Sequence, residues 1–83
     1  MNRQALMDTF MRARGTNSEY VFIAIKLPDT EVPEIIVNRK ENFDRKEAYY
    51  LKTYDENLRH YHNKDITIVG MSYGDLEQIK NLY

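Results

Sequence analysis

Cysteine is absent from this 83-residue sequence, and so is tryptophan. Without cysteine the chain has no disulfide bond, no thiolate nucleophile and no cysteine-ligated zinc or iron–sulfur cluster. The longest apolar run covers only residues 21–25, so it is too short to cross a bilayer, and no signal peptide is recognisable. We therefore expect no membrane contact and a cytoplasmic location, since a chain without cysteine suits a reducing compartment.

An excess of charge of one sign is also missing. Twelve basic and thirteen acidic residues give a net charge of −1, which excludes a chain-wide attraction to nucleic acid. The sign nevertheless alternates along the chain, positive in residues 1–15 and 39–64 and negative in residues 16–38 and 65–83. A local basic face within residues 39–64 therefore stays open as a binding surface.

What remains is a globular composition, with 42% hydrophobic and 30% charged residues. Three glycines and two prolines are too few for a low-complexity segment, and no internal repeat divides the chain. A chain of this length supports one modest core. The sequence predicts a single small domain, residues 1–83.

The spacing of apolar residues predicts three helices. The first covers about residues 2–15, with Asn2 as its N-cap and Gly15 as a left-handed terminator. Its apolar face consists of Leu6, Met7, Phe10 and Met11. The second and longest helix covers about residues 42–61, and one arc of it holds Phe43, Glu47, Tyr50, Leu51, Tyr54, Leu58 and Tyr61. A short last helix is predicted to begin near Asp75.

Three strands are predicted between these helices, at residues 20–27, 34–38 and 65–71. The first is apolar on both faces, which is typical of a central strand. We expect an α+β fold with the element order α-β-β-α-β-α and a mixed three-stranded sheet in the order 2-1-3. In this arrangement the long helix covers one face, and the terminal helices lie at the other face or at an edge.

Two stretches of the sequence resemble a known group of proteins. The first contains residues 34–38, residues 41–43, Lys46, Tyr49, Tyr50 and Tyr54, and the second contains residues 65–70 with Tyr73 and Gly74. Together they resemble small uncharacterised proteins encoded by phages and prophages of Gram-positive bacteria. This resemblance implies a phage-linked, intracellular setting, and it assigns no catalytic residue.

The sequence favours no enzymatic chemistry. Ser18 and Ser72 lie outside any nucleophile motif, and the glycines do not form a phosphate-binding loop. His60 and His62 are the only histidines, and at the predicted end of a helix their side chains diverge by about 200°. We therefore expect neither a catalytic residue, nor a cofactor, nor a metal site. Whether this histidine pair ever binds a metal is left open.

Tyrosine is abundant, with seven residues, and one of them stands out. Tyr49 falls opposite the apolar arc of the long helix, near Arg45, Lys52 and Glu56. An exposed tyrosine among charges is typical of protein interfaces, so these four residues form the candidate interaction surface. Seven basic residues of the same region also suit a nucleic-acid backbone, namely Arg39, Lys40, Arg45, Lys46, Lys52, Arg59 and Lys64.

Acidic residues interleave with these basic ones, and this favours protein contact over nucleic acid. We expect a small non-enzymatic phage or prophage accessory protein that acts by protein–protein contact, in host-factor binding or regulation. The alternative is a nucleic-acid-binding regulatory factor that uses the basic and aromatic long helix. Self-association as a homodimer is expected too, because a three-stranded sheet has two edges to pair or cover.

Overall fold

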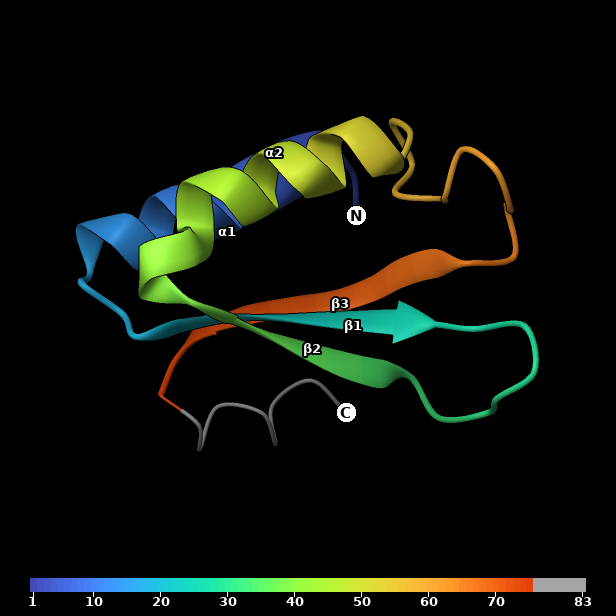
Figure 1. The fold of residues 1–83 in the computed structure, drawn as a ribbon, viewed down its shortest axis with the longest axis horizontal. Coiled ribbons are helices and arrows are strands. Elements are labelled where there is room, and N and C mark those ends of the chain that lie inside the picture. Colours follow the sequence, from blue (N-terminus) through green and yellow to red (C-terminus); the bar gives the residue numbers. More distant parts are fainter. Residues whose placement is uncertain (76–83) are drawn as a thin grey trace.

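In the computed structural model, which describes residues 1–75, two helices lie on one face of a three-stranded sheet (Figure 1). The elements follow in the order α1 (Arg3–Gly15), β1 (Tyr20–Lys26), β2 (Glu34–Arg39), a 3-10 turn η1 (Lys40–Asn42), α2 (Phe43–Thr53) and β3 (Thr67–Gly74). This confirms the α+β class. The predicted last helix lies outside the described residues.

The strand order β2-β1-β3 is confirmed, but the sheet is antiparallel throughout and not mixed. β2 and β3 run in the same direction, as a crossover through α2 requires, but β1 lies between them. No parallel pair therefore forms among the three strands. All five residues from Val21 to Ile25 are buried, so β1 is the apolar central strand that its sequence predicts.

The start of α1 follows the prediction and its end does not. Asn2 caps the helix, because its side-chain oxygen accepts a hydrogen bond of 2.9 Å from the amide of Ala5. The left-handed residue after the helix is Asn17, with φ of 54°, and not Gly15. The buried face also differs, since Met11 is 60% exposed and Ala13 is buried in its place.

The predicted long helix is wrong, because α2 ends at Thr53. Tyr54 is extended, and the Asp55 carboxylate then accepts hydrogen bonds of 2.9 and 3.0 Å from the amides of Asn57 and Arg59. An aspartate that binds nearby amides in this way offers the backbone an alternative to the helix. Leu58 completes the turn with a positive φ of 61°.

The turn changes the surroundings of the residues after it. Leu58 is fully buried in the core, whereas Tyr61, expected on the same apolar arc, is 52% exposed. β3 begins at Thr67, two residues later than predicted, and a register shift in its pairing with β1 follows Ile68. Because of this shift, both Ile68 and Met71 lie opposite residues of β1 that face the core.

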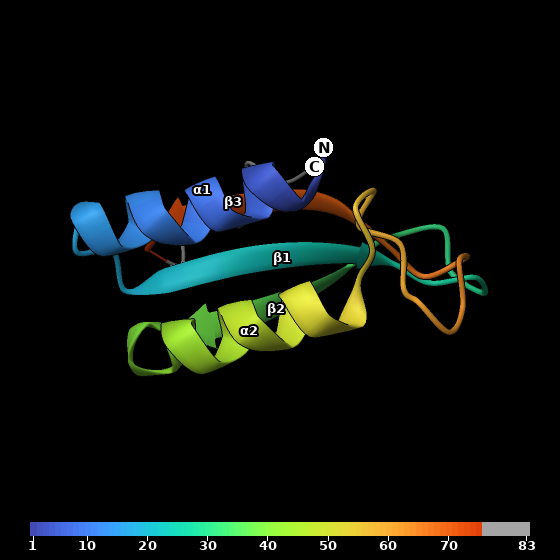
Figure 2. The same ribbon diagram turned by 90° about the horizontal axis from the view of Figure 1, so that it is seen from above.

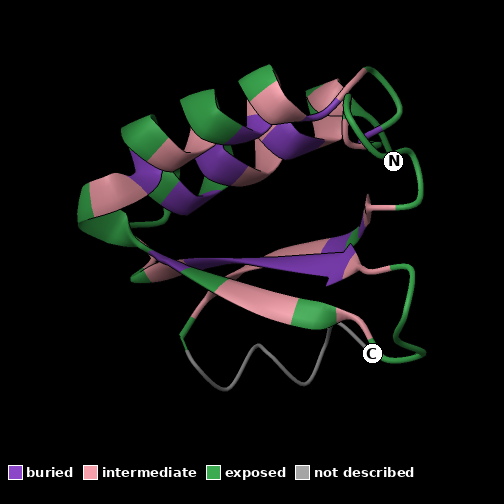
Figure 3. Ribbon diagram, turned by 45° about the vertical axis from the view of Figure 1, so that its right-hand side comes forward, coloured by how far each residue is buried: buried purple, intermediate pink, exposed green. Residues whose placement is uncertain are grey.

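Both helices cover the same face of the sheet, contrary to the prediction that the N-terminal helix lies at the other face or an edge (Figures 1 and 2). α1 lies over β3 and α2 over β2, and the buried residues of both helices face the sheet (Figure 3). Phe10 of α1 joins the two helices. Its ring lies 5.6 Å from that of Phe43 and 6.3 Å from that of Tyr50, both on α2.

We predict that Phe10→Ala destabilises the fold by about 3–5 kcal/mol, because it removes a fully buried ring and leaves a cavity between the helices. That is a large part of the roughly 4–12 kcal/mol expected for a domain of this length. Urea unfolding measures the change. Met11→Ala, at the exposed neighbour, is the control and should stay within about 0.5 kcal/mol of wild type. If the two substitutions lowered the free energy of unfolding equally, the packing of Phe10 between the helices would be contradicted.

A second prediction concerns the turn after α2. The hydrogen bond from Lys64, with those from the amides of Arg59 and Asn57, lowers the pKa of Asp55 from 3.8 to about 2. A depressed pKa stabilises the folded state above the ordinary pKa, and this contribution is lost as the pH falls from about 4 to about 2. The stability gap between wild type and Asp55→Asn should therefore close across that range, as measured by urea unfolding at each pH.

Asp29→Asn, in the exposed turn between β1 and β2, is the matched control for this experiment. It should follow wild type at every pH. A gap between wild type and Asp55→Asn that stays constant from neutral pH to pH 2 would show that the charge of Asp55 does not stabilise the turn.

Candidate functional site

The outer side of α2 carries a tyrosine among basic side chains. Arg45, Tyr49 and Lys52 are all exposed, and their spacing of four and three residues places them on one face of the helix. Lys46 lies beside them, half-buried. We call Arg45, Lys46, Tyr49 and Lys52 the Tyr49 surface.

Two neighbours hold the ring of Tyr49, which is 50% exposed. Its centroid lies 5.3 Å from that of Tyr50 in an edge-to-face arrangement. The Lys46 ammonium nitrogen lies 5.0 Å from the Tyr49 centroid and 5.6 Å from the Tyr50 centroid. A ring fixed in this way loses little side-chain entropy when a partner covers it.

Tyr50 connects this surface to the sheet. Its hydroxyl donates a hydrogen bond of 3.1 Å to Oδ1 of Asn38 on β2, and the Asn38 amide donates one of 3.1 Å to the carbonyl of Val21 on β1. Both side chains are almost fully buried, and burial raises the pKa of Tyr50 to about 12. Asn38 is not among the candidate residues predicted from the sequence, although a polar residue that follows Ile-Ile-Val in a strand is a signal of a buried hydrogen bond.

Helical spacing does not place Glu56 beside Tyr49, because α2 ends three residues before Glu56. It is exposed, and its carbonyl accepts a hydrogen bond of 3.2 Å from the amide of Arg3. The Arg3 guanidinium also donates to the carbonyls of Leu51 and Tyr54, at 2.7 and 3.1 Å. Glu56 therefore belongs to the contact between α1 and the end of α2.

Asp44 and Glu47 of α2, and Asp55 after it, pair with cations outside the Tyr49 surface. The Arg14 guanidinium contacts both Asp44 and Glu47 at 2.7 Å, and the ion pairs raise the pKa of Arg14. In the same way Lys64 contacts Asp55 at 2.6 Å. Within residues 1–75, no ion pair neutralises the three cations of the Tyr49 surface. The folded chain thus separates charges that are interleaved in the sequence.

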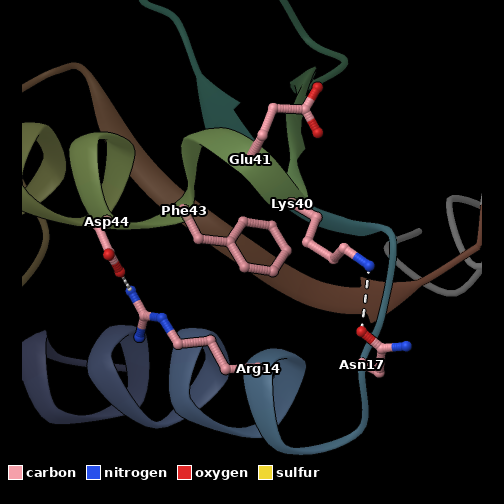
Figure 4. A pocket seen from close by; sticks show the side chains of 6 residues that line it. All are labelled: Arg14, Asn17, Lys40, Glu41, Phe43 and Asp44. Atoms are coloured by element: carbon pink, nitrogen blue, oxygen red, sulfur yellow. Dashed lines mark hydrogen bonds and ion pairs between the residues drawn. The ribbon is translucent and has the colours of Figure 1, made fainter.

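A pocket of about 280 Å³ opens at the other end of α2 (Figure 4). Its lining residues are Arg14, Asn17, Lys40, Glu41, Phe43 and Asp44. Arg14 points toward Asp44 on one side of the Phe43 ring, and Lys40 donates a hydrogen bond of 3.1 Å to Asn17 on the other. These four polar groups therefore bind in pairs, and Glu41 pairs with Arg39 instead, so the polar groups do not converge on a common point.

The two histidines lie in the loop after α2 and not at a helix end. Their ring centroids are 5.8 Å apart, and Nδ1 of His60 accepts a hydrogen bond of 3.0 Å from the amide of His62. Within residues 1–75, no group of three or more acidic or histidine side chains is placed to hold a metal ion.

No protein-family model, curated protein or solved structure matches this chain. None of the helices within residues 1–75 is long and apolar enough to cross a membrane.

We predict that Tyr50→Phe destabilises the protein by about 1–3 kcal/mol, because the buried Oδ1 of Asn38 loses its donor. The free energy of unfolding in urea measures this loss. Tyr61→Phe removes a hydroxyl from a half-exposed ring, so it should stay within about 0.5 kcal/mol of wild type. If Tyr50→Phe also left the free energy of unfolding unchanged, the hydrogen bond between α2 and β2 would contribute nothing to the stability of the fold.

Proposed function

We propose that this chain is a small, non-enzymatic binding protein that acts by protein–protein contact through the Tyr49 surface. The observation that carries the proposal is a half-exposed, fixed tyrosine among cations that have no acidic partner within residues 1–75. The sequence resemblance supports a phage or prophage accessory protein in the cytoplasm, with binding of a host factor or regulation as its role.

The chemistry of the Tyr49 surface favours a partner with an acidic patch. Tyrosine and arginine are the residues that most often dominate the binding energy of protein interfaces. Arg45 and Lys52 flank the tyrosine on the exposed face of α2, and Lys46 contacts its ring. Carboxylates of a partner would meet these cations, and an apolar or aromatic side chain would cover the ring.

The arrangement of the remaining polar groups also supports a binding role over a catalytic one. In the pocket beside Phe43, the charged groups already have partners. The hydroxyl of Ser18 shares a hydrogen bond of 2.7 Å with that of Thr16, and no base contacts it within residues 1–75. A nucleophile needs a base within hydrogen-bond distance.

Nucleic acid is the alternative partner, and the same separation of charge supports it. Three cations around an exposed ring can contact phosphates and stack a base. The two partner classes differ in salt dependence, because each phosphate contact releases counterions and a protein contact of few charges releases far fewer. A second copy of the chain is a further candidate, since a homodimer formed through a sheet edge is expected from the sequence.

We predict that Tyr49→Ala abolishes capture of the partner from a lysate of a Gram-positive host by the tagged protein. Truncation of a central tyrosine in an interface commonly costs about 2 kcal/mol or more, which weakens binding roughly thirtyfold. Tyr61→Ala is a closely matched control, because Tyr61 is 52% exposed and Lys64 lies 5.4 Å from its ring centroid.

Each outcome of this experiment separates the candidates. Capture that survives nuclease treatment and is lost only in Tyr49→Ala supports protein–protein contact. Capture that nuclease removes, together with Tyr49-dependent binding to oligonucleotides at about 50 mM salt, supports the nucleic-acid alternative. Equal capture by wild type and Tyr49→Ala overturns the assignment of this surface.

A further inference from the structure

The two edges of the sheet differ. β2 pairs with β1 on one side, and no segment of residues 1–75 pairs with its other side. The beginning of β3 is covered instead, because Arg59 forms a bridge with Thr67 and the amide of Ile68 donates to the carbonyl of Leu58 at 2.9 Å. An uncovered edge presents a row of amides and carbonyls that can pair with another strand.

The Tyr49 surface lies beside this edge of β2, with which no segment of residues 1–75 pairs. The Tyr50–Asn38 hydrogen bond places α2 over β2, the outermost strand on that side. Glu47 faces α1, where it contacts Arg14. Tyr49 lies about 200° further around the helix, so it points away from α1 and outward above the edge of β2.

We infer that β2 accepts an extended segment of a partner protein as a fourth strand, with acidic residues facing α2 and β-branched residues on the opposite face. This inference rests on the proposed function and states how the partner binds. Strand addition to an open edge is a general mode of protein recognition, in which backbone hydrogen bonds give affinity and alternate side chains give specificity.

The pattern of the partner segment follows from the two faces of β2. Side chains of an added strand alternate between the faces of the sheet. On the face of α2 they lie beside Ile36 and Asn38 of β2, which pair with core residues of β1. Above them Lys46 contacts the Tyr50 ring, and its charge favours carboxylates. On the other face they meet Ile35 and Val37, which pair with Ala24 and Phe22 of β1 and favour apolar β-branched side chains. Val37 is 40% exposed and available for this contact.

A second copy of the chain fits this edge poorly. Pairing of β2 with β2 would place the strands about 4.8 Å apart. Each strand carries its own α2 above it, whereas packed helix axes need about 8–10 Å. The two Tyr49 surfaces would also bring like charges together. A single strand without a helix above it meets neither obstacle.

The test is binding of an eight-residue peptide of alternating valine and glutamate to the full chain, followed by amide NMR shifts. We expect shifts in β2 and around Tyr49, and at least tenfold weaker binding of a valine–lysine peptide. Val37→Lys should weaken binding severalfold, since it places a charge against the apolar side of the peptide. Val69→Lys is the matched control on the other edge strand, at 44% exposure, and should leave binding unchanged.

The contrary outcomes are distinct. Shifts confined to α2 would retain the Tyr49 surface as a binding site and overturn strand addition. Shifts in β3, or a loss of binding in Val69→Lys, would show that the peptide pairs with β3 and not with β2. Absence of binding at millimolar peptide overturns the inference, while the Tyr49→Ala capture experiment still decides the proposed function by itself. A dimer in light scattering that Val37→Lys dissociates would make a second copy the occupant.

Discussion

The hydrogen bond between Tyr50 and Asn38 determines how the layers of this molecule are arranged. A buried hydroxyl and a buried amide each need a partner, and here each largely satisfies the other across the boundary between α2 and β2. This contact holds α2 over β2. Glu47 then faces Arg14 of α1, and Tyr49 faces solvent above the sheet edge. One internal polar pair therefore orients the surface for which we propose a function.

Much of this arrangement could be predicted from local patterns. The N-cap Asn2, the apolar strand β1 and the strand order β2-β1-β3 all follow from residue spacing and the crossover rule. The end of α2 could not be predicted in this way, because the helical periodicity of apolar residues continues to Tyr61. The helix ends at the turn in which the Asp55 carboxylate accepts hydrogen bonds from the amides of Asn57 and Arg59 and contacts Lys64, which lies beyond the predicted helix.

Part of the candidate site could also be predicted from the sequence. Helical spacing alone places Arg45 and Lys52 beside Tyr49, because residues four and three positions apart share a face. The same spacing does not apply to Glu56, because α2 ends at Thr53. The sequence shows an excess of positive charge in residues 39–64, but it does not show which cations lack an acidic partner. The packing of α1 against α2 decides this, because it brings Arg14 to Asp44 and Glu47.

The early end of α2 also explains why the two sheet edges differ. In a helix that continued to Tyr61, the carbonyl of Leu58 would accept a helical amide, and Arg59 could not form its bridge with Thr67. The Asp55 turn instead returns the chain, so that Leu58 fills the core and its carbonyl accepts the amide of Ile68. The beginning of the β3 edge, at Thr67 and Ile68, is thereby covered by the chain that leads into it. β2 leads directly into η1 and α2, which rise above the sheet, so its own connection cannot cover its edge.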